Sequence, residues 1–218
     1  MKNNIGNNEY EIDNFNEIGE ILFGENNRPL SENEFYFLQI LVRGKDGNHV
    51  SGNNKNRLVK YYCIRSKEQL IGLKKEIKGI CKTVNGRAYI HPTRRDSIEV
   101  ANLCLILTSK TFVSKNWTAF RGTYSTACGQ SCVSNDKKFI VDLDDYKMGS
   151  IEMEEMKEFI NGLRGKGDDK IVGEIETKNG CHLITLPFDT GEFKKKYNNI
   201  DIHKNNPTLL YFSWIDIN

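Results

Sequence analysis

The chain has 218 residues, a formal net charge of +2, 38% hydrophobic residues and 28% charged residues. These values are typical of a globular protein with one domain, and they exclude a strong global field toward nucleic acid or membrane, so any basic site is local. The sequence shows no run of about 18 apolar residues and no signal-peptide pattern, which predicts a soluble, cytoplasmic protein without a membrane partner.

The N-terminal segment 1–33 is rich in Asn and Glu, with isolated apolar residues. We expect a loosely ordered arm that contains a short helix near 15–23. The next two apolar stretches, 35–43 and 58–65, predict strands, and the Gly- and Asn-rich segment 44–56 predicts the loop between them. The two strands are therefore expected to form a hairpin with a long loop.

Helical periodicity, capping residues and turn residues define the elements that follow. In chain order, they are a helix at 67–82 capped by Ser66, a strand at 86–92, a helix at 97–111 capped by Asp96, an irregular segment at 112–136, a strand at 138–144, a helix opened by Ser150, a strand pair within 170–188, a short helix from Asp189 or Thr190 to about Tyr197, and a strand at 207–215.

The strand pair within 170–188 has the clearest local pattern, because Asn179-Gly180 is a preferred pair for a two-residue type I′ turn. Helices and strands alternate along the chain, with hairpins among them. We therefore expect an α+β fold, a mixed α/β sandwich in which helices pack on one mixed sheet, with 34–218 as a single domain.

Six cysteines are present, and only Cys128 and Cys132 have a spacing that resembles a metal site. A second cysteine pair or a histidine at zinc-finger spacing is missing from the sequence around them. We expect reduced thiols, and the sequence leaves the role of these two residues open.

Carboxylates cluster at the end of the apolar strand 138–144. Side chains alternate along a strand, so Asp142 and Asp144 point to the same side. Two like charges at this spacing are costly unless a cation lies between them, which favours a divalent ion such as Mg²⁺ or Mn²⁺. The alternative is a strand end in solvent, with Asp144 and Asp145 at the start of a turn.

His182 lies on the second strand of the 170–188 pair, in the sequence GCHLIT. With Asn179-Gly180 as the turn, Thr177 would face His182, and Lys178 would lie close by. The apolar residues that follow His182 allow a buried core histidine, whereas the polar neighbours favour one that points at a ligand. The pattern leaves both alternatives open.

These motifs resemble the archaeo-eukaryotic primase superfamily, the catalytic domain of primase-polymerases. The family has an Asp-hydrophobic-Asp pair at a strand end, then a small residue two positions before a histidine, then a hydrophobic-Asp pair. VDLD at 141–144 resembles the first motif and NGCHLI at 179–184 the second. Asp189, Asp201 and Asp216 each fit the third, and we favour Asp216. RAYIHPTRRD and HKNNPTLLY also resemble uncharacterised proteins of tailed phages.

The resemblance implies an RRM-like core and a site for two Mg²⁺ or Mn²⁺ ions on Asp142 and Asp144, with Asp216 as a third ligand. The ions would bridge the triphosphate and the 3′-hydroxyl of a nucleic acid. His182 would contact the phosphates of a nucleoside triphosphate. These roles follow from the family and not from spacing.

Basic and polar residues elsewhere are candidates to complete a phosphate site. Arg87 shares a strand face with Tyr89 and His91, and an arginine fork suits phosphate. Lys178 lies at the end of the strand before the expected hairpin turn, and Arg121 and Ser125 lie just before the carboxylate strand. For each of these residues the alternative is a solvated surface position.

We therefore expect a metal-dependent nucleotidyltransferase that resembles a primase-polymerase, with a nucleoside triphosphate and nucleic acid as its partners. The alternative is a non-catalytic phage accessory protein that binds nucleotides or nucleic acid through a primase-like fold. A phosphodiesterase is disfavoured, because the His and Thr residues of HLIT and IHPT have the wrong spacing. Base preference, the choice between DNA and RNA, and the oligomeric state cannot be read from the sequence.

Overall fold

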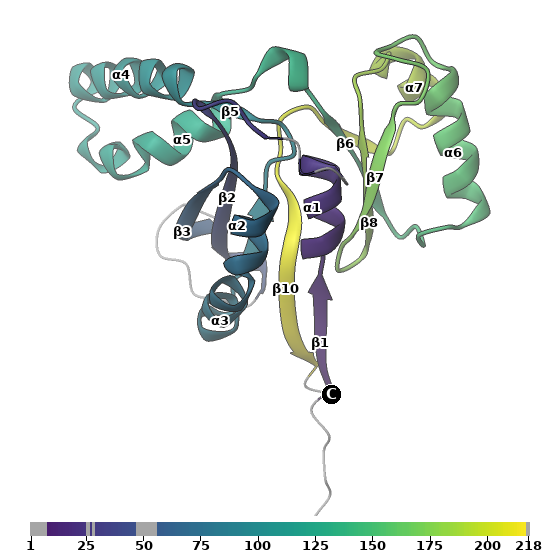
Figure 1. Cartoon of the computed structure of the whole chain (residues 1–218), viewed down its shortest axis with the longest axis horizontal. Helices are drawn as coiled ribbons and strands as arrows, with labels where there is room; N and C mark the ends of the chain where they lie inside the picture. Colours follow the sequence, from purple (N-terminus) through teal and green to yellow (C-terminus); the bar gives the residue numbers. More distant parts are fainter. Residues whose placement is uncertain (1–7, 25–26, 28, 47–55, 217–218) are drawn as a thin grey trace, which may run out of the picture.

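The computed structural model describes residues 8–24, 27, 29–46 and 56–216. Within these residues the chain forms an α+β fold, which confirms the expected class (Figure 1). The strands do not form the expected single mixed sheet. They form two separate sheets, and every strand pair in both sheets is antiparallel.

The large sheet has the strand order β1-β10-β4-β2-β3, with β5 paired to β2, and the small sheet has the order β7-β8-β6-β9. The strands of the large sheet are β1 Asn8–Asp13, β2 Glu34–Arg43, β3 Asn56–Ile64, β4 Arg87–Ile90, β5 Arg95–Asp96 and β10 Thr208–Asp216. Those of the small sheet are β6 Phe139–Asp144, β7 Ile171–Glu176, β8 Gly180–Thr185 and β9 Asp201–His203.

The helices of the described chain pack around these sheets. The α-helices are α1 Phe15–Phe23, α2 Lys67–Gly72, α3 Lys74–Val84, α4 Ser97–Ser114, α5 Thr123–Gln130, α6 Ile151–Gly162 and α7 Thr190–Lys196. The 3-10 helices are η1 Gly44–Asp46, η2 Trp117–Gly122 and η3 Ser134–Asp136. None of the helices in the described part of the chain is long and apolar enough to cross a membrane.

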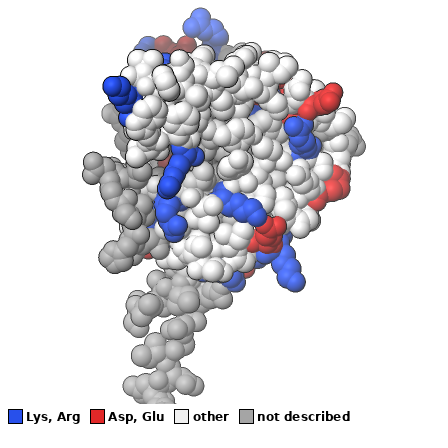
Figure 2. All heavy atoms as spheres, turned by 90° about the vertical axis from the view of Figure 1, so that its left-hand side faces the viewer, with Lys and Arg blue, Asp and Glu red and all other residues white. Residues whose placement is uncertain are grey.

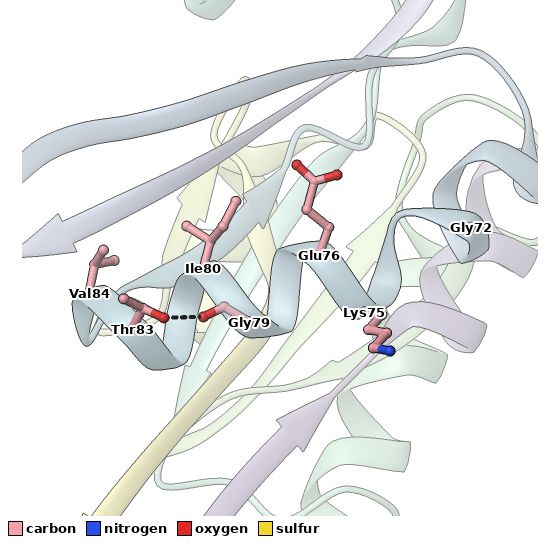
Figure 3. Close-up of a pocket in the computed structure, with 7 residues that line it drawn as sticks. All are labelled: Gly72, Lys75, Glu76, Gly79, Ile80, Thr83 and Val84. Carbon is pink, nitrogen blue, oxygen red and sulfur yellow. Dashed lines mark hydrogen bonds between the residues drawn. The ribbon is translucent and has the colours of Figure 1, made fainter.

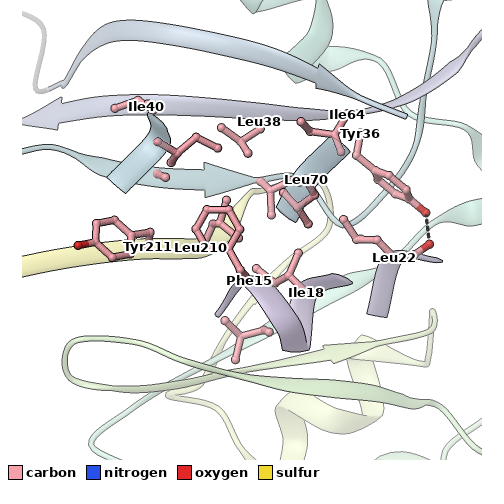
Figure 4. Packing of buried hydrophobic residues seen from close by; sticks show 14 of the residues in the cluster. Phe15, Ile18, Leu22, Tyr36, Leu38, Ile40, Ile64, Leu70, Leu210 and Tyr211 are labelled. Carbon is pink, nitrogen blue, oxygen red and sulfur yellow. Dashed lines mark hydrogen bonds between the residues drawn. The ribbon is translucent and has the colours of Figure 1, made fainter. Parts of the chain in front are cut away.

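The N-terminal segment contradicts the expectation of a loosely ordered arm over residues 8–23. β1 pairs with β10 along its whole length, and the short helix expected near 15–23 is present as α1. Phe15, Ile18 and Leu22 lie on one face of α1 and are buried in the main core (Figure 4). The segment is therefore structural, although residues 1–7, 25, 26 and 28 of the expected arm lie outside the described residues.

The expected helix at 67–82 is divided at Leu73 into α2 and α3, both of which pack against the large sheet. One half of the expected capping box is present, since Ser66 Oγ accepts a hydrogen bond from Gln69 N, whereas Gln69 Oε1 accepts from Arg65 N, one residue before the N-cap. The expected caps at Asp96, Ser150 and Asp189 also accept backbone N–H groups of α4, α6 and α7.

The small sheet has two different faces. Val141 and Leu143 of β6, with Leu183 of β8, pack against α6 and α7 in an apolar cluster. On the other face Ile140 and Ile184 join the main core beside α1. The small sheet thus lies between α6 and α7 on one side and α1 with the large sheet on the other (Figure 1).

The hairpin of β7 and β8 turns one residue earlier than predicted. Thr177 N donates to Gly180 O, and Ile175, not Thr177, lies opposite His182. Gly180 is needed for another reason: a Cβ on this residue would lie 2.1 Å from Leu143 O of β6. The glycine therefore allows two strands to approach closely, and the residues of the turn are Lys178 and Asn179.

Residues 97–130 form a helical subdomain of α4, η2 and α5 at the upper left of Figure 1. The segment 112–136 was expected to be irregular, but α5 and the 3-10 helices occupy most of it. Val100 of α4 and Ala127 of α5 pack on Phe35 and Phe37 of β2. The subdomain is thus attached to the large sheet by one apolar cluster.

A buried arginine links the helical subdomain to the loop between β9 and β10. Arg95 is fully buried, and its Nη2 bonds His91 Nδ1 at 2.6 Å and donates to Asn205 Oδ1 at 2.9 Å. Asn205 Nδ2 in turn donates to Gly129 O of α5. Burial lowers the pKa of Arg95 to about 10.

Candidate functional site

The candidate site begins with the alternation of β6. Leu143 is fully buried toward α6, so Asp142 and Asp144 point from the opposite face of the small sheet. His182 lies directly opposite Asp142 in the register of β6 and β8 and therefore shares that face. The three residues are on the same side of the sheet, as the resemblance implied.

Asp142 lies between two histidines. His182 Nε2 is 3.5 Å from Asp142 Oδ1, and His203 Nε2 is 3.6 Å from Asp142 Oδ2. On its other nitrogen, His182 Nδ1 hydrogen-bonds Thr208 Oγ1 at 2.8 Å. Hydrogen bonding and charge from His182, with a smaller contribution from His203, hold the pKa of Asp142 below its usual value despite partial burial. The carboxylate is thus oriented and kept ionised.

A cavity of about 160 Å³ opens between the two sheets at this point. Asp142, Asp144 and His182 line it from the small sheet, and residues of β2, β4 and β10 line it from the large sheet. Its lining residues are Arg43, Arg87, Tyr89, Asp142, Asp144, Thr177, Lys178, Asn179, His182 and Leu209. The carboxylates lie on the small sheet, and the basic side chains, which we call the basic wall, are Arg43 and Arg87 of the large sheet and Lys178 of the β7–β8 turn.

The basic wall is held in place by aromatic rings and hydrogen bonds. Arg87 stacks on Phe212 with its Cζ 4.0 Å from the ring centroid, and its Nε donates to Asp46 Oδ2 at 2.8 Å. Arg43 Nη1 donates to Tyr89 Oη at 2.8 Å. Two hydrogen bonds from one guanidinium to one carboxylate fix the plane of Arg87.

Lys178 differs from Arg87 in its surroundings. Its Nζ lies 5.9 Å from the ring centroid of Phe212 and 5.3 Å from that of Trp214. Within the described residues, no carboxylate lies at ion-pair distance from this ammonium group. Aromatic faces therefore position the lysine charge without neutralising it, which leaves it able to pair with an anion.

Among the described residues, no group of three or more His, Cys, Asp or Glu side chains is arranged to hold an ion. Asp142 and Asp144 supply two carboxylates on one cavity. Mg²⁺ commonly binds through one or two carboxylates and completes its shell with water and substrate phosphates. The donor set fits an ion that arrives with a polyphosphate, and it does not fit a closed protein cage.

Of the carboxylates considered for a third ligand, Asp216 ends β10, and its side chain lies outside the described part of the chain. Asp189 caps α7 and accepts from the backbone of Gly191 and Glu192. Asp201 instead lies opposite Asp142 in the register of β6 and β9, at the edge of the small sheet.

The structure also separates Arg121 and Ser125 from the cavity. Arg121 belongs to the exposed 3-10 helix η2, and Ser125 Oγ donates to Gly122 O within the helical subdomain. Cys128 of α5 and Cys132, two residues after this helix, are free thiols, and burial raises the pKa of Cys128 to about 12. None of these four residues lines the cavity that contains Asp142.

Sequence reasoning placed Asp142, Asp144, His182, Arg87 and Lys178 at one site, and the structure brings these five together. It missed His203 and Arg43. The signal for His203 was present in DIH at 201–203, which has the same alternation as DLD at 142–144. Arg43 ends a strand about a hundred residues before the carboxylates, and only the fold brings it near.

A larger groove of about 660 Å³ follows α3 (Figure 3). Its lining residues are Gly72, Lys75, Glu76, Gly79, Ile80, Thr83 and Val84. The only carboxylate among them, Glu76, is bonded to Lys60 and Tyr62, and the Thr83 hydroxyl donates to Gly79 O. The groove therefore lacks the converging polar groups that distinguish the smaller cavity.

Comparison of the chain with protein-family models, with curated proteins and with solved structures finds no match in any of the three.

Proposed function

We propose that the chain is a metal-dependent nucleotidyltransferase that resembles a primase-polymerase and transfers nucleotides from a nucleoside triphosphate to the 3′-hydroxyl of a nucleic acid. The observation that carries the proposal is the cavity where Asp142 and Asp144 face Arg87 and Lys178, with His182 between the two sheets. Two carboxylates beside the ammonium group of Lys178 suit a ligand that is an anion and brings its own cation, as a metal-bound triphosphate does.

Mg²⁺ or Mn²⁺ would be held by Asp142 and Asp144. When bound, such an ion lowers the pKa of an attacking hydroxyl and neutralises charge on the transferring phosphoryl group. The two imidazoles contribute before any ligand arrives, because they fix both oxygens of Asp142 and favour its ionised form.

The basic wall would bind the phosphates. Lys178 supplies a point charge that aromatic rings hold toward the cavity, and Arg87 supplies a planar guanidinium. The cavity, at about 160 Å³, is smaller than the pockets of roughly 300–1,000 Å³ that enclose whole ligands. It therefore suits the phosphate end of a nucleotide, with sugar and base outside. We place the activity in the cytoplasm of a bacterial or phage-infected cell.

The first experiment measures binding. Nucleoside triphosphate with Mn²⁺, at 100 times its Kd, should stabilise the protein by about 2.7 kcal/mol in a thermal-shift assay. Asp142→Ala and Lys178→Ala should abolish the shift. Asp145→Asn is the matched control: it removes the neighbouring charge outside the cavity, and asparagine tolerates the left-handed backbone of this residue, φ 70°.

The second experiment measures catalysis, as template-dependent incorporation of labelled nucleotide onto a primed strand. Incorporation that is lost in Asp144→Asn supports the proposal. Binding of the triphosphate without incorporation on any template would instead support the second candidate. Absence of both signals in the wild-type protein would contradict the two candidates together.

The second candidate is a non-catalytic accessory protein that binds nucleotides or nucleic acid through the same cavity. Two observations favour it over an enzyme. Both oxygens of Asp142 already face imidazoles, and the guanidinium of Arg87 is already bonded to Asp46 through Nε and Nη2. A site whose polar groups are occupied by each other binds a ligand only if the ligand replaces those contacts.

A further inference from the structure

The outer face of α4 is apolar and exposed, and it carries an inference that is independent of the proposed function. In this helix, Val100 is buried and Leu103 and Leu107 are partly buried against the large sheet and α5. On the opposite side, Leu105 is 70% exposed, Phe112 67% and Val113 79%. A helix that is apolar on every side is normally buried on every side.

The exposed face continues beyond the end of α4. Trp117 stacks on Phe120 with ring centroids 6.3 Å apart and meets the edge of Phe112 at 5.9 Å. The large apolar side chains that are exposed in this subdomain are Ile98, Leu105, Ile106, Phe112, Val113, Trp117 and Phe120. We call these seven residues the α4 patch. Figure 2 shows that the side of the molecule with α4 and α5 is mainly uncharged.

We propose that the α4 patch binds the α4 patch of a second copy of this chain, with the two α4 helices antiparallel and the two-fold axis near Leu105.

The spacing of the patch is self-complementary. Ile98 and Phe112 are each seven residues from Leu105, so all three lie within about 20° of one line along the helix, with about 10.5 Å between neighbours. In an antiparallel pair that crosses at Leu105, Ile98 of one copy lies opposite Phe112 of the other. A two-fold interface requires this reciprocity, in which each member of a contact pair also makes the reverse contact.

The area of the patch is sufficient for a stable dimer. With a full area on the order of 200 Å² for each side chain, the seven residues expose on the order of 800 Å², which is the area that each partner contributes to a standard interface. The centre of the patch is apolar, and the aromatic cluster of Trp117 and Phe120 lies at the end that would cover the first turn of the partner helix. This distribution is typical of interfaces between identical subunits.

The test is the mass of the full-length protein in solution, by light scattering and by sedimentation over a range of concentrations. The wild-type protein is expected to be a dimer, and Leu105→Glu should raise the dimer Kd by about 30-fold or more, the effect of losing a central anchor residue. Ile151→Glu is the matched control, because Ile151 is 76% exposed at the start of α6, outside the patch. It should dimerise as the wild type does.

Cysteine cross-linking tests the orientation of the two helices. Leu105→Cys should form a disulfide-linked dimer under mild oxidation, with the wild-type protein and its free cysteines as the blank. Ile98→Cys should cross-link to Phe112→Cys in a mixture of the two variants and not to itself. A dimer that cross-links Ile98→Cys to itself would overturn the antiparallel arrangement.

A wild-type protein that stays monomeric at the highest concentration would overturn the proposal as a whole. A monomeric protein is then tested for binding of nucleic acid, because residues 100–135 carry Lys110, Lys115 and Arg121 and no acidic residue. If a single-stranded oligonucleotide quenches the fluorescence of the monomer, and Trp117→Ala removes the quenching, the patch binds nucleic acid and not a second copy.

Discussion

The two faces of the small sheet are built from the same strands and have opposite chemistry. On the face toward α6 and α7, β6 contributes Val141 and Leu143 to a closed apolar core. On the other face the same strand contributes Asp142 and Asp144 to a cavity against the large sheet. The difference shows how a six-residue strand can position a polar site: the buried residues fix the strand, and the residues between them are then held at a defined spacing.

The largest expected effect on stability comes from the face of the small sheet that packs on α6 and α7. Leu143→Ala removes a fully buried side chain and should lower the free energy of unfolding by about 2–5 kcal/mol, through lost burial and a residual cavity. Asp144→Ala, one residue further on the exposed face, should change it by less than about 0.5 kcal/mol. Urea unfolding of both variants measures the contrast, and equal losses would show that the two faces do not differ as described.

A second prediction concerns the contact between the two sheets on the other side of the small sheet. Asn14 is buried, and its Nδ2 donates to Glu176 O of β7 and to Leu209 O of β10, both at 2.9 Å. Asn14→Ala leaves one buried and one partly buried carbonyl group without this donor and should cost about 2–3 kcal/mol in urea unfolding. Asn198→Ala, at an exposed loop position, is the control and should be neutral.

A third substitution tests how closely β8 approaches β6. Gly180→Ala places a methyl group against the backbone of Leu143 and should cost about 1–3 kcal/mol, because a backbone atom cannot move aside as a side chain can. Gly79, by contrast, lies in the middle of α3, and a methyl group there would meet no atom within 4 Å. Gly79→Ala should therefore stabilise the protein by about 0.5–1 kcal/mol. A neutral Gly180→Ala would mean that the strands are further apart than described.

The smallest expected effect is the change with pH in the stability that Asp142 contributes. The pKa of Asp142 is lowered in the folded protein, so its contribution to stability is present above the unfolded value, about 3.9, and is lost as pH falls through the folded value. The carboxylate is partly exposed, so the contribution should be below about 1 kcal/mol. The stability difference between wild type and Asp142→Asn should therefore shrink from pH 6 to pH 3; a constant difference would argue against the pairing with His182 and His203.

Local sequence patterns were sufficient for much of the fold and for half of the site. The alternation in FIVDLD located β6 and put Asp142 and Asp144 on one face, and the hairpin pattern placed His182 near them, because these features depend on neighbours in the chain. The turn itself was misplaced by one residue. Gly180 is required by contact with Leu143, a tertiary constraint that a local turn preference does not contain.

The remaining errors have the same origin. β1 was hidden in a polar N-terminal sequence, and α1 was expected only as a short helix within a loosely ordered arm, because the stability of both comes from packing on β10 at the other end of the chain. β9 has three residues, so the alternation in DIH was too short to identify a strand, and His203 was not recognised. The pairing that creates two sheets in place of one is also a long-range property, since nothing in the strands themselves selects their partners.

The hydrogen bonds of Asn205 have a consequence for both surfaces of the molecule. Asn205 lies two residues after His203 and three before Thr208, and these residues bond Asp142 and His182 respectively. Its carboxamide is anchored to Arg95 and to Gly129 of α5. The side chains that orient Asp142 are thus linked to the helical subdomain through one amide. A displacement of α5 would therefore alter the contacts of His182 and His203 together.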